Sequence, residues 1–394
     1  MSYKQIYLKK GKEESLKRFH PWIFSGAIHH MDEGIEEGEI VRVITASGDF
    51  IAVGHYQIGS ITVRVLSFED ITIDEDFFVN RLSSALRMRI AIGLADNENN
   101  TTFRLVHGEG DNLPGLIVDC YGKTVVMQAH SVGMHVCRNV VCKALQKVMS
   151  SRMDNVFYKS ETTLPFKAEL GQENGFLLGG DADNVAIENG LKFHIDWLKG
   201  QKTGFFVDQR DNRSLLEKYS KGRSVLNMFC YTGGFSVYAM RGGAKEVHSV
   251  DSSAKAIDLT NQNIEMNFPG DKRHDAFCDD AFKYLDEHDQ KYDLIILDPP
   301  AFAKHRSAIR NALKGYTRLN LKGFQKIKHG GILFTFSCSQ AVSKDQFRAA
   351  VFTAAAQAGR NVRILHQLHQ PADHPINIYH PEGEYLKGLV LYVE

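Results

Sequence analysis

The chain has 394 residues, which predicts two or three domains, and its 47 lysines and arginines balance 47 aspartates and glutamates. A zero net charge excludes a global field that would attract a polyanion, so nucleic-acid binding would need local basic patches. The six cysteines form no C-x-x-C pair and no run approaches the roughly 18 apolar residues of a membrane span, so we expect a cytoplasmic protein without a metal.

Residues 1–72 are predicted to form a β-rich domain. Short β-branched runs alternate with glycine turns, at 39–44, 50–53 and 61–66. Ahead of them, basic side chains are interleaved with the aromatic residues Phe19, His20, Trp22 and Phe24. One interpretation is a solvated tail followed by a core strand. The other is an RNA-contacting edge, in which lysine and arginine bind phosphates and the rings stack on bases. The stretch H-P-W-I-F-S-G-A-I resembles the entry to a PUA domain, a small RNA-binding β-barrel.

Residues 73–188 are predicted to form a small central α+β domain. One apolar helix face is expected from a four-residue spacing, at Phe78, Leu82, Leu86 and Ile90. Strands are expected at 102–106, 116–118, 124–129 and 156–159, and a second helix over 131–149. No set of side chains in this region suggests catalysis. We interpret His107, Glu109 and Asp111 as turn residues rather than metal ligands.

Residues 189–394 alternate between strand and helix patterns. Strands are expected at 191–197, 224–228, 246–251, 276–278, 293–297 and 331–336, with helices between most of them. This alternation predicts an α/β domain with a doubly wound, Rossmann-like parallel sheet. A last strand, 388–393, could close the edge of that sheet.

The strand-to-helix turn at 227–236, N-M-F-C-Y-T-G-G-F-S, is the predicted cofactor site. Its glycines allow a close approach of a ligand, but it lacks G-x-G-x-x-G, the dinucleotide fingerprint. Asp251 ends the next strand and could accept both ribose hydroxyls, while Asp279 could accept from an adenine amino group; either could instead be a helix N-cap. Adenosine recognition without a pyrophosphate loop favours S-adenosyl-L-methionine. The predicted contacts are Asn227, Phe229, Tyr231, Thr232, Gly233, Asp251, Ser252, Asp279, Asp298 and Pro299.

Two strand ends carry the predicted chemistry, Cys338 in T-F-S-C-S and Asp298 in L-D-P-P-A-F. A thiolate that adds to C6 of cytosine makes C5 nucleophilic, so that C5 can accept a methyl group. Cysteine suits this role because a useful thiolate fraction exists near neutral pH. Asp298 could stabilise the ring at N3. The alternative for Cys338 is a small buried hydrophobe.

A run of one charge sign lies between and beyond these two strand ends. Residues 301–344 contain no acid, and their basic residues are Lys304, Arg306, Arg310, Lys314, Arg318, Lys322, Lys326, Lys328 and Lys344. Like charges at four-residue spacing on one helical face cost stability unless an anion offsets them. We therefore interpret the run as a phosphate-binding surface.

The whole chain resembles the ribosomal RNA large subunit methyltransferase I family. The resemblance rests on K-T-G-F-F-V-D-Q-R-D, N-M-F-C-Y-T-G-G-F-S, S-V-D, L-D-P-P-A-F, T-F-S-C-S, A-D-H-P and P-E-G-E-Y-L-K-G. It implies a PUA domain, a middle domain and a Rossmann-like domain, S-adenosylmethionine as donor, and 5-methylcytidine formation in 23S ribosomal RNA. It also implies Cys338 as nucleophile, and Gln209 and Arg210 near the amino-acid end of the donor.

One position departs from the pattern of other RNA cytosine-C5 enzymes, which carry a second cysteine after the proline of D-x-P-C. Pro300 stands there, so product release must use another base. The acid of D-P-P argues against amine-directed enzymes, which typically carry N-P-P. Two alternatives stay open: methylation of another RNA base position, and a non-catalytic RNA-binding ribosome assembly factor. The oligomeric state is open as well, with a homodimer as one alternative.

Overall fold

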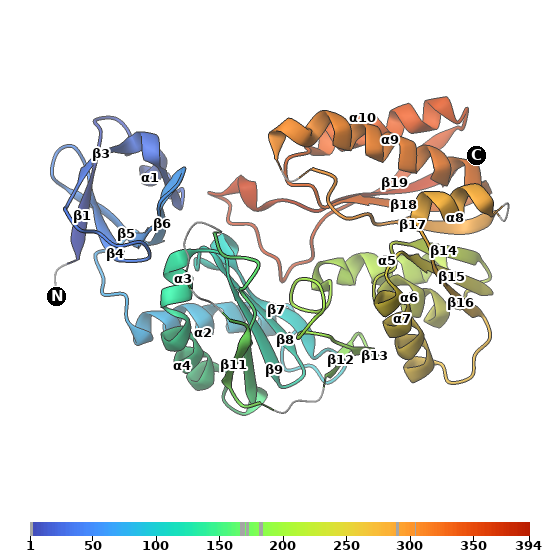
Figure 1. Ribbon diagram of the computed structural model, residues 1–394, viewed down its shortest axis with the longest axis horizontal. Coiled ribbons are helices and arrows are strands. Elements are labelled where there is room, and N and C mark those ends of the chain that lie inside the picture. The colour runs from blue at the N-terminus through green and yellow to red at the C-terminus, as the bar shows by residue number, and fades with distance from the viewer. Residues whose placement is uncertain (1–2, 166–169, 171–172, 181–183, 289–290, 304) are drawn as a thin grey trace. The chain divides into compact units, whose positions relative to one another are not determined.

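The computed structural model describes residues 3–165, 170, 173–180, 184–288, 291–303 and 305–394 (Figure 1). The chain divides into two compact units. The first comprises residues 1–190, 195–207 and 372–383, and the second comprises 191–194, 208–371 and 384–394. A division into three domains, 1–72, 73–188 and 189–394, stays a prediction. Among the described residues, no helix combines the length and the apolar character that crossing a membrane requires.

The first unit contains a six-stranded sheet with the order β2-β6-β5-β4-β1-β3. Its strands are β1 (Lys4–Leu8), β2 (Trp22–Phe24), β3 (Ile28–Met31), β4 (Ile40–Ile44), β5 (Phe50–Tyr56) and β6 (Ile61–Ser67), and a short helix α1 (Glu14–Lys17) follows β1. β-branched side chains from alternate positions fill its core, including Val41, Val43 and Val63. The strands predicted at 39–44, 50–53 and 61–66 are therefore present.

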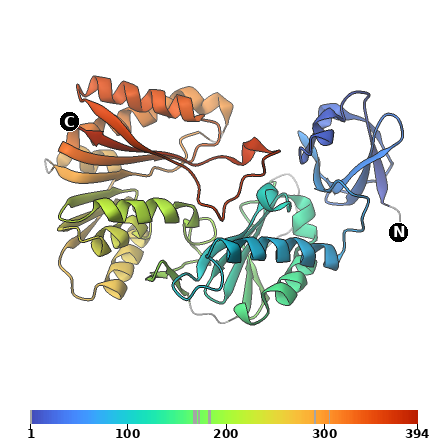
Figure 2. The same ribbon diagram turned by 180° about the vertical axis from the view of Figure 1, so that it is seen from behind.

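A five-stranded sheet with the order β11-β10-β9-β8-β7 forms the rest of the first unit (Figure 2). Its strands are β7 (Thr102–His107), β8 (Leu116–Tyr121), β9 (Thr124–Ala129), β10 (Asn155–Tyr158) and β11 (Gly175–Leu178). The helices are α2 (Glu75–Ala91), α3 (Val132–Val136) and α4 (Arg138–Met149), and a strand β12 (Val185–Glu188) follows. The single helix predicted over 131–149 is thus two helices that meet at Cys137.

The apolar face predicted for α2 is wrong at its last position. Phe78, Leu82 and Leu86 are buried, but Ile90 is 40% exposed and Arg89 is fully buried in its place. A four-residue step advances about 40° beyond a full helical turn, so three steps carry the fourth residue off the face. The guanidinium of Arg89 donates to Asp111 Oδ2 (2.8 Å), which gives this predicted turn residue a structural ion pair.

The segment 372–383 contains the A-D-H-P motif and belongs to the first unit. The main chain of Arg104 donates to the carboxylate of Asp373 (2.8 Å), and Arg89 donates to the Asp373 carbonyl (2.7 Å). A Cβ on Gly110 would lie 1.9 Å from the carbonyl oxygen of Pro375, so only glycine fits this close approach. The segment is therefore held by buried polar contacts with β7 and α2.

The second unit contains a seven-stranded mixed sheet with the order β16-β15-β14-β17-β18-β20-β19. The strands are β14 (Ser224–Met228), β15 (Glu246–Asp251), β16 (His274–Cys278), β17 (Tyr292–Leu297), β18 (Ile327–Ser337), β19 (Val362–Leu368) and β20 (Lys387–Val393), and β13 (Leu191–His194) precedes them. Strands β14 to β18 run parallel. This is the α/β, Rossmann-like arrangement that the alternation of strands and helices predicts.

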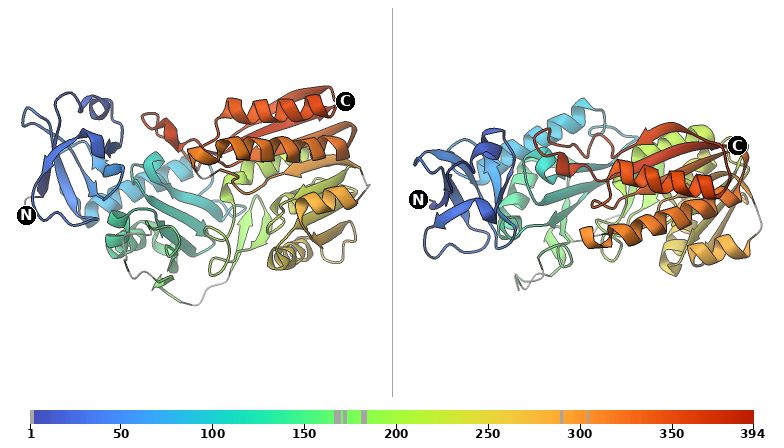
Figure 3. Two further views of the ribbon diagram at one scale, coloured as in Figure 1. Left: turned by 45° about the horizontal axis from the view of Figure 1, so that its top comes forward. Right: turned by 90° about the horizontal axis from the view of Figure 1, so that it is seen from above.

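Helices cover both faces of this sheet, with α9 and α10 side by side on one face and α5, α6 and α7 on the other (Figures 1 and 3). Their bounds are α5 (Arg210–Tyr219), α6 (Gly234–Arg241), α7 (Ala254–Asn267), α8 (Ala281–Glu287), α9 (Ile309–Lys326) and α10 (Lys344–Gln357). Because β14 to β18 are parallel, the turns that follow them all lie at the carboxyl ends of the strands, on one side of the sheet.

The expectation that the last strand could close the sheet edge is wrong. β20 lies between β18 and β19 and pairs antiparallel with both. Six of its seven residues are buried, as an interior strand requires, whereas the side chains of β19 are largely exposed. The V-R-I-L-H-Q-L segment of β19 escaped notice because an edge strand needs no continuous apolar run.

Candidate functional site

The turn after β14 holds three residues in the left-handed region. Their φ angles are 58° for Phe229, 50° for Tyr231 and 75° for Gly233. Two non-glycine residues with positive φ in one turn are uncommon and cost free energy, and such strain clusters at ligand sites. A Cβ on Gly233 would lie 2.6 Å from Cγ2 of Thr260, so glycine is needed for space as well as for conformation. The turn therefore has a shape that simple strand-to-helix connection does not require.

The carboxylate of Asp251 joins this turn to the turn after β15. The Tyr231 N–H donates to Oδ2 (3.0 Å) and the Ser253 N–H donates to Oδ1 (3.0 Å). Each carboxylate oxygen keeps a second lone pair, so Asp251 can still accept from a ligand. The N-cap alternative for Asp251 does not hold, because Ser253 caps α7. Two backbone amides therefore position Asp251 at the carboxyl ends of the parallel strands.

Asp279 lies beside Asp251, since its N–H donates to the Asp251 carbonyl (3.1 Å). The N-cap alternative fails here too, because Asp280 caps α8. The carboxylate of Asp279 is 3.4 Å from Nζ of Lys283. Asp251 and Asp279 thus lie at neighbouring strand ends, as the parallel pairing of β15 with β16 requires.

Asn227 is a buried amide with one unused acceptor. Its Nδ2 donates to Ser236 Oγ (2.9 Å), while its Oδ1 is buried and has no hydrogen-bond partner among the described residues. A buried acceptor without a partner costs free energy and needs an explanation. The remaining predicted contacts differ in exposure: Thr232 is buried, Phe229 and Tyr231 are partly exposed, and Ser252 is exposed.

Asp298 follows β17 and is only partly exposed. Burial, helped by the negative charge of Asp208, raises the pKa of Asp298 to about 7, and a hydrogen bond from Gln209 and the charge of Arg213 oppose the rise. Gln209 Nε2 donates to Asp298 Oδ2 (3.0 Å), and Asn212 Nδ2 donates to Gln209 Oε1 (2.6 Å), which orients that amide. The carboxyl is therefore close to half protonated at neutral pH. Arg210, the other residue implied by the resemblance, is buried at the start of α5.

The thiol of Cys338 lies at the end of β18 and is partly exposed. It donates to the carbonyl of Pro299 over 4.0 Å, which places it beside the residue that follows Asp298. The two predicted strand ends are thus adjacent. Burial raises the pKa of the Cys230 thiol to about 12 and that of the Cys137 thiol to about 11, so these two thiols stay protonated near neutral pH.

The serines on either side of Cys338 explain how the thiol is held. Ser337 Oγ donates to Tyr316 Oη (2.8 Å), and Tyr316 Oη shares a hydrogen bond with Ser339 Oγ (2.8 Å). The Ala303 N–H also donates to Ser339 Oγ (3.2 Å). T-F-S-C-S is therefore tied to α9 and to the D-P-P-A-F loop, and Cys338 sits between two anchored neighbours.

Three residues of this site were missed by the sequence reasoning. Tyr385 Oη donates to Asp208 Oδ2 (2.7 Å), and Lys387 Nζ donates to the carbonyls of Ser339 (2.7 Å) and Val342 (2.8 Å). Asp208, Tyr385 and Lys387 come from motifs already noted, D-Q-R-D and P-E-G-E-Y-L-K-G. Sequence spacing alone could not connect these residues, because the hydrogen-bond partners given above for Tyr385 and Lys387 are distant in sequence.

The basic run on and around α9 is only partly available to an anion. Lys322 forms an ion pair with Asp286, Lys328 pairs with Asp293 (3.1 Å) and Lys344 pairs with Glu384. Lys326 donates to the His288 carbonyl, and Arg318 lies over the Phe282 ring. In the part of the chain that the structure describes, Arg306, Arg310 and Lys314 are exposed with no ion pair; Lys304 lies outside it. The prediction of a phosphate-binding surface is therefore kept only for the N-terminal half of α9 and the residues before it.

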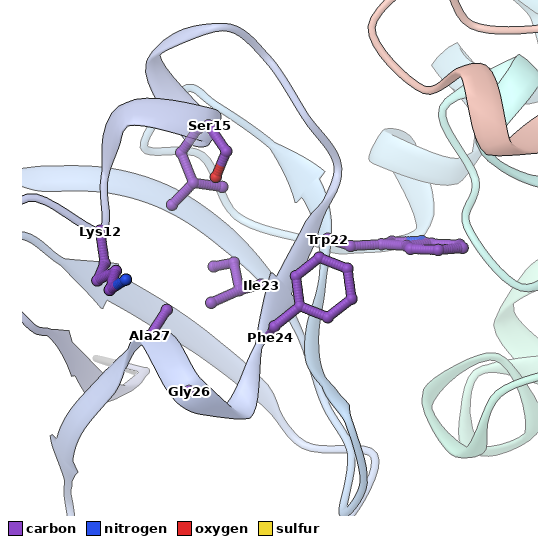
Figure 4. Close-up of a pocket in the computed structure, with 8 residues that line it drawn as sticks. Lys12, Ser15, Trp22, Ile23, Phe24, Gly26 and Ala27 are labelled. Atoms are coloured by element: carbon purple, nitrogen blue, oxygen red, sulfur yellow. The ribbon is translucent and has the colours of Figure 1, made fainter.

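The first unit has a cavity of about 290 Å³ between α1 and β2, lined by Lys12, Ser15, Leu16, Trp22, Ile23, Phe24, Gly26 and Ala27 (Figure 4). The predicted stacking rings are not equivalent. Trp22 donates its indole N–H to Glu109 (2.8 Å) and packs on His380, whereas Phe19 and Phe24 are each 48% exposed. Of the aromatic residues in this stretch, Phe19 and Phe24 are therefore the more exposed ones, and their stacking on bases stays a prediction.

Comparisons with known proteins bear on both units. A model described as an S-adenosylmethionine-dependent methyltransferase matches residues 176–382, and a PUA-like domain model matches 6–68. The chain is 41% identical to "Ribosomal RNA large subunit methyltransferase I" of Aeromonas hydrophila over 394 residues, covering 98% of both chains. The protein of that name in Tolumonas auensis is also 41% identical, with 98% of both chains covered.

Solved structures share the fold. An S-adenosylmethionine-dependent methyltransferase structure from Streptococcus mutans has a TM-score of 0.84 at 22% identity and covers 100% of both chains. A methyltransferase structure in complex with SAH has a TM-score of 0.84 at 23% identity, again over 100% of both chains. The fold of this chain is thus shared with these two solved structures over their whole length.

Proposed function

The chain belongs to the ribosomal RNA large subunit methyltransferase I family, and from this premise we propose that it methylates C5 of a cytosine in 23S ribosomal RNA. Membership makes it an S-adenosylmethionine-dependent methyltransferase with a PUA-like domain. One observation supports the choice of cytosine C5. The Cys338 thiol contacts Pro299, the residue after Asp298, and the carboxyl of Asp298 has a pKa of about 7. A nucleophile and a proton donor for the same ring are thus adjacent.

The protonation of Asp298 favours cytosine over uridine. Neutral cytosine presents an acceptor at N3 beside an amino donor, and a protonated carboxyl offers an O–H donor beside an acceptor oxygen. Uridine presents an N–H donor at N3, which suits an ionised carboxylate instead. Because burial and Asp208 keep Asp298 partly protonated near neutral pH, its hydrogen-bonding pattern complements cytosine.

The residues at the carboxyl ends of the parallel strands fit the methyl donor. Asp251 and Asp279 supply acceptors for ribose hydroxyls and an adenine amino group, and the buried Oδ1 of Asn227 is an acceptor without a partner among the described residues. Gly233 leaves no room for a side chain in the turn that a ligand would approach. Bound S-adenosylmethionine supplies the methyl group as an electrophilic carbon.

The chain's own residues then perform the activation. The Cys338 thiolate forms a bond to C6 while Asp298 gives a proton or hydrogen bond to N3, which moves the ring electrons toward C5. C5 would form its bond to the methyl group while the methyl–sulfonium bond breaks and leaves its electron pair on the donor sulfur. A base then removes the proton from C5, and the electron pair of that C–H bond re-forms the ring double bond as the C6–S bond breaks and returns the thiolate to Cys338. Any proton that N3 received goes back to Asp298.

The test is the identity of the methylated nucleoside. Purified protein is incubated with isotope-labelled S-adenosylmethionine and 23S ribosomal RNA from cells that lack the enzyme, and digested nucleosides are separated by mass spectrometry. We expect labelled 5-methylcytidine at one position. Labelled 5-methyluridine or an N-methylated guanosine would refute the cytosine assignment. RNA binding without any label would instead support an assembly factor.

Exchanging Arg306, Arg310 and Lys314 together for glutamine is expected to weaken RNA binding about tenfold and to reduce the salt dependence of the affinity by about two counterions. These cations lie near the N-terminus of α9, where the helix dipole already disfavours positive charge, so an anion must offset them. Fluorescence anisotropy with an RNA fragment at several salt concentrations measures both quantities.

Lys322→Gln is the matched control for this triple exchange, because Lys322 is already paired with Asp286 and should contribute little. An unchanged salt slope in the triple variant would mean that the phosphate surface lies elsewhere.

Asp251→Asn is expected to weaken S-adenosylmethionine binding about tenfold, because one charged acceptor for two hydroxyls becomes a neutral one. Isothermal titration calorimetry with the donor alone measures the effect, and RNA affinity should not change. Asp258→Asn, an exposed acid on the neighbouring helix α7, is the control. Equal donor affinity in both variants would remove Asp251 from the donor site.

A further inference from the structure

Lys387 is a buried lysine at the start of β20, beside the proposed nucleophile. Its main chain pairs with Ser337, the residue before Cys338, and its side chain is 6% exposed in the folded chain. Burying an ammonium group is costly unless it is well partnered, so a buried lysine needs hydrogen-bond or charge partners.

The Lys387 side chain reaches across the segment that carries the thiol. Nζ donates to the carbonyls of Ser339 and Val342, the two ends of the turn that follows Cys338. The Val342 N–H donates to the Ser339 carbonyl (3.1 Å), which closes the same turn. One ammonium hydrogen remains beyond these two bonds, since a lysine has three.

The charges around Lys387 indicate what its ammonium does. Burial lowers the pKa of Lys387 to about 8, the charges of Cys338 and Glu384 oppose that fall, and Lys344 adds to it. Tyr316 also faces the thiol from α9 and responds to its charge, but it is a neutral hydroxyl bonded to both serines. Among these groups, Lys387 is the buried cation that interacts with a thiolate at Cys338.

We propose that Lys387 is a positioning residue for methyl transfer, whose ammonium stabilises the thiolate of Cys338 and whose two hydrogen bonds fix the turn after it. The inference rests on the proposed role of Cys338 as nucleophile. Attraction between the two charges is mutual, so the ammonium favours the thiolate as much as the thiolate favours the ammonium. The effect is present while Lys387 is charged and fades as the pH rises above its pKa of about 8.

The pH dependence of Cys338 alkylation tests this directly. The full-length protein reacts with iodoacetamide over a range of pH, and mass spectrometry of peptides follows each thiol separately. In Lys387→Met the midpoint for Cys338 should rise by about one pH unit, which slows alkylation near neutral pH about tenfold. Cys278, an exposed thiol at the end of β16, is the internal reference and should not change.

A second variant separates charge from shape. Lys387→Gln keeps a side-chain NH2 group that can donate two hydrogen bonds but removes the charge, so it should show the same shift as Lys387→Met. Lys344→Met removes an exposed cation that pairs with Glu384 and should shift the midpoint far less. Relative to the wild type at the same pH, Lys387→Met should have a reduced kcat near neutral pH and an unchanged KM for RNA. The ratio of the two kcat values should approach one as the pH rises above the Lys387 pKa of about 8, which a purely structural defect would not do.

Identical alkylation profiles in wild type, Lys387→Met and Lys387→Gln would overturn the inference. This outcome is distinct from failure of the proposed function, which is read from covalent trapping of RNA. A shifted thiol profile without trapping would leave the Lys387–Cys338 pair intact and refute the cytosine mechanism. Covalent trapping together with an unshifted alkylation profile would support the cytosine mechanism and refute the proposed role of Lys387.

Discussion

Cys338→Ala is expected to lower methyl transfer by at least about a thousandfold, because the proposed mechanism activates C5 through a bond between the Cys338 sulfur and C6. The thiol is partly exposed, while both neighbouring serines are anchored to Tyr316, so truncation at Cys338 should leave the fold intact. RNA that carries 5-fluorocytosine gives the sharpest measurement. Its C5 fluorine cannot leave as a proton does, so the wild type should be trapped as a covalent complex visible in a denaturing gel.

The variant should form no such complex, although its affinity for donor and RNA should match that of the wild type. Cys278→Ala serves as the control, since this exposed thiol lies at the end of β16 rather than after β18. Trapping should be unaffected there. A normal methylation rate in Cys338→Ala would falsify the covalent mechanism.

Asp298→Asn is expected to lower kcat about a hundredfold, since an amide cannot give a proton to N3. The kcat/KM of the wild type should fall as the pH rises through the Asp298 pKa of about 7, because the protonated carboxyl is the active form. Asp208→Asn provides a companion measurement. It removes a charge that raises this pKa, so the decline in kcat/KM should begin at lower pH.

Asp298→Asn, which should lower activity, should raise the stability of the fold at neutral and higher pH. The folded pKa of Asp298 lies above its usual value of 3.8, so between these two values the unfolded chain is ionised while the folded one is not. The stability of the wild type therefore falls as the pH rises from about 4 to about 7 and stays reduced above that range. Asp298→Asn lacks this loss.

Urea denaturation near pH 8 and near pH 4 measures the stability effect. The free energy of unfolding of Asp298→Asn should exceed that of the wild type at the higher pH and match it at the lower one. A pH-independent difference between the two proteins would mean that Asp298 keeps an ordinary carboxyl pKa. In that case cytosine recognition by a protonated Asp298 would have to be abandoned.

The elements that sequence reasoning found are those in which local pattern and tertiary environment agree. β9, β14 and β15 begin and end at the predicted residues, because short runs that contain β-branched apolar residues and are bounded by turn residues are typical of strands. Asp251, Asp298 and Cys338 were recognisable because each follows such a run. In a parallel sheet the ends of these runs meet at one edge.

The errors arose where a residue's environment is set by distant parts of the chain. Ile90 and Arg89 exchange their expected exposures because Asp111 and Asp373 supply partners for a buried guanidinium. β20 is interior because β19 covers its far side. The basic run on α9 is partly neutralised by acids of α8 and of neighbouring strands that its own sequence does not contain.

The sequence by itself determined most of the strands and helices, the chemical groups at the strand ends and the family to which the chain is similar. Only the tertiary structure decided that Asp208 lies close enough to Asp298 to raise its pKa, and that Lys387 crosses the turn after Cys338. The reason is physical. Apolar periodicity is a local property of a chain, whereas hydrogen bonds, burial and Coulomb interactions depend on distances between residues far apart in sequence.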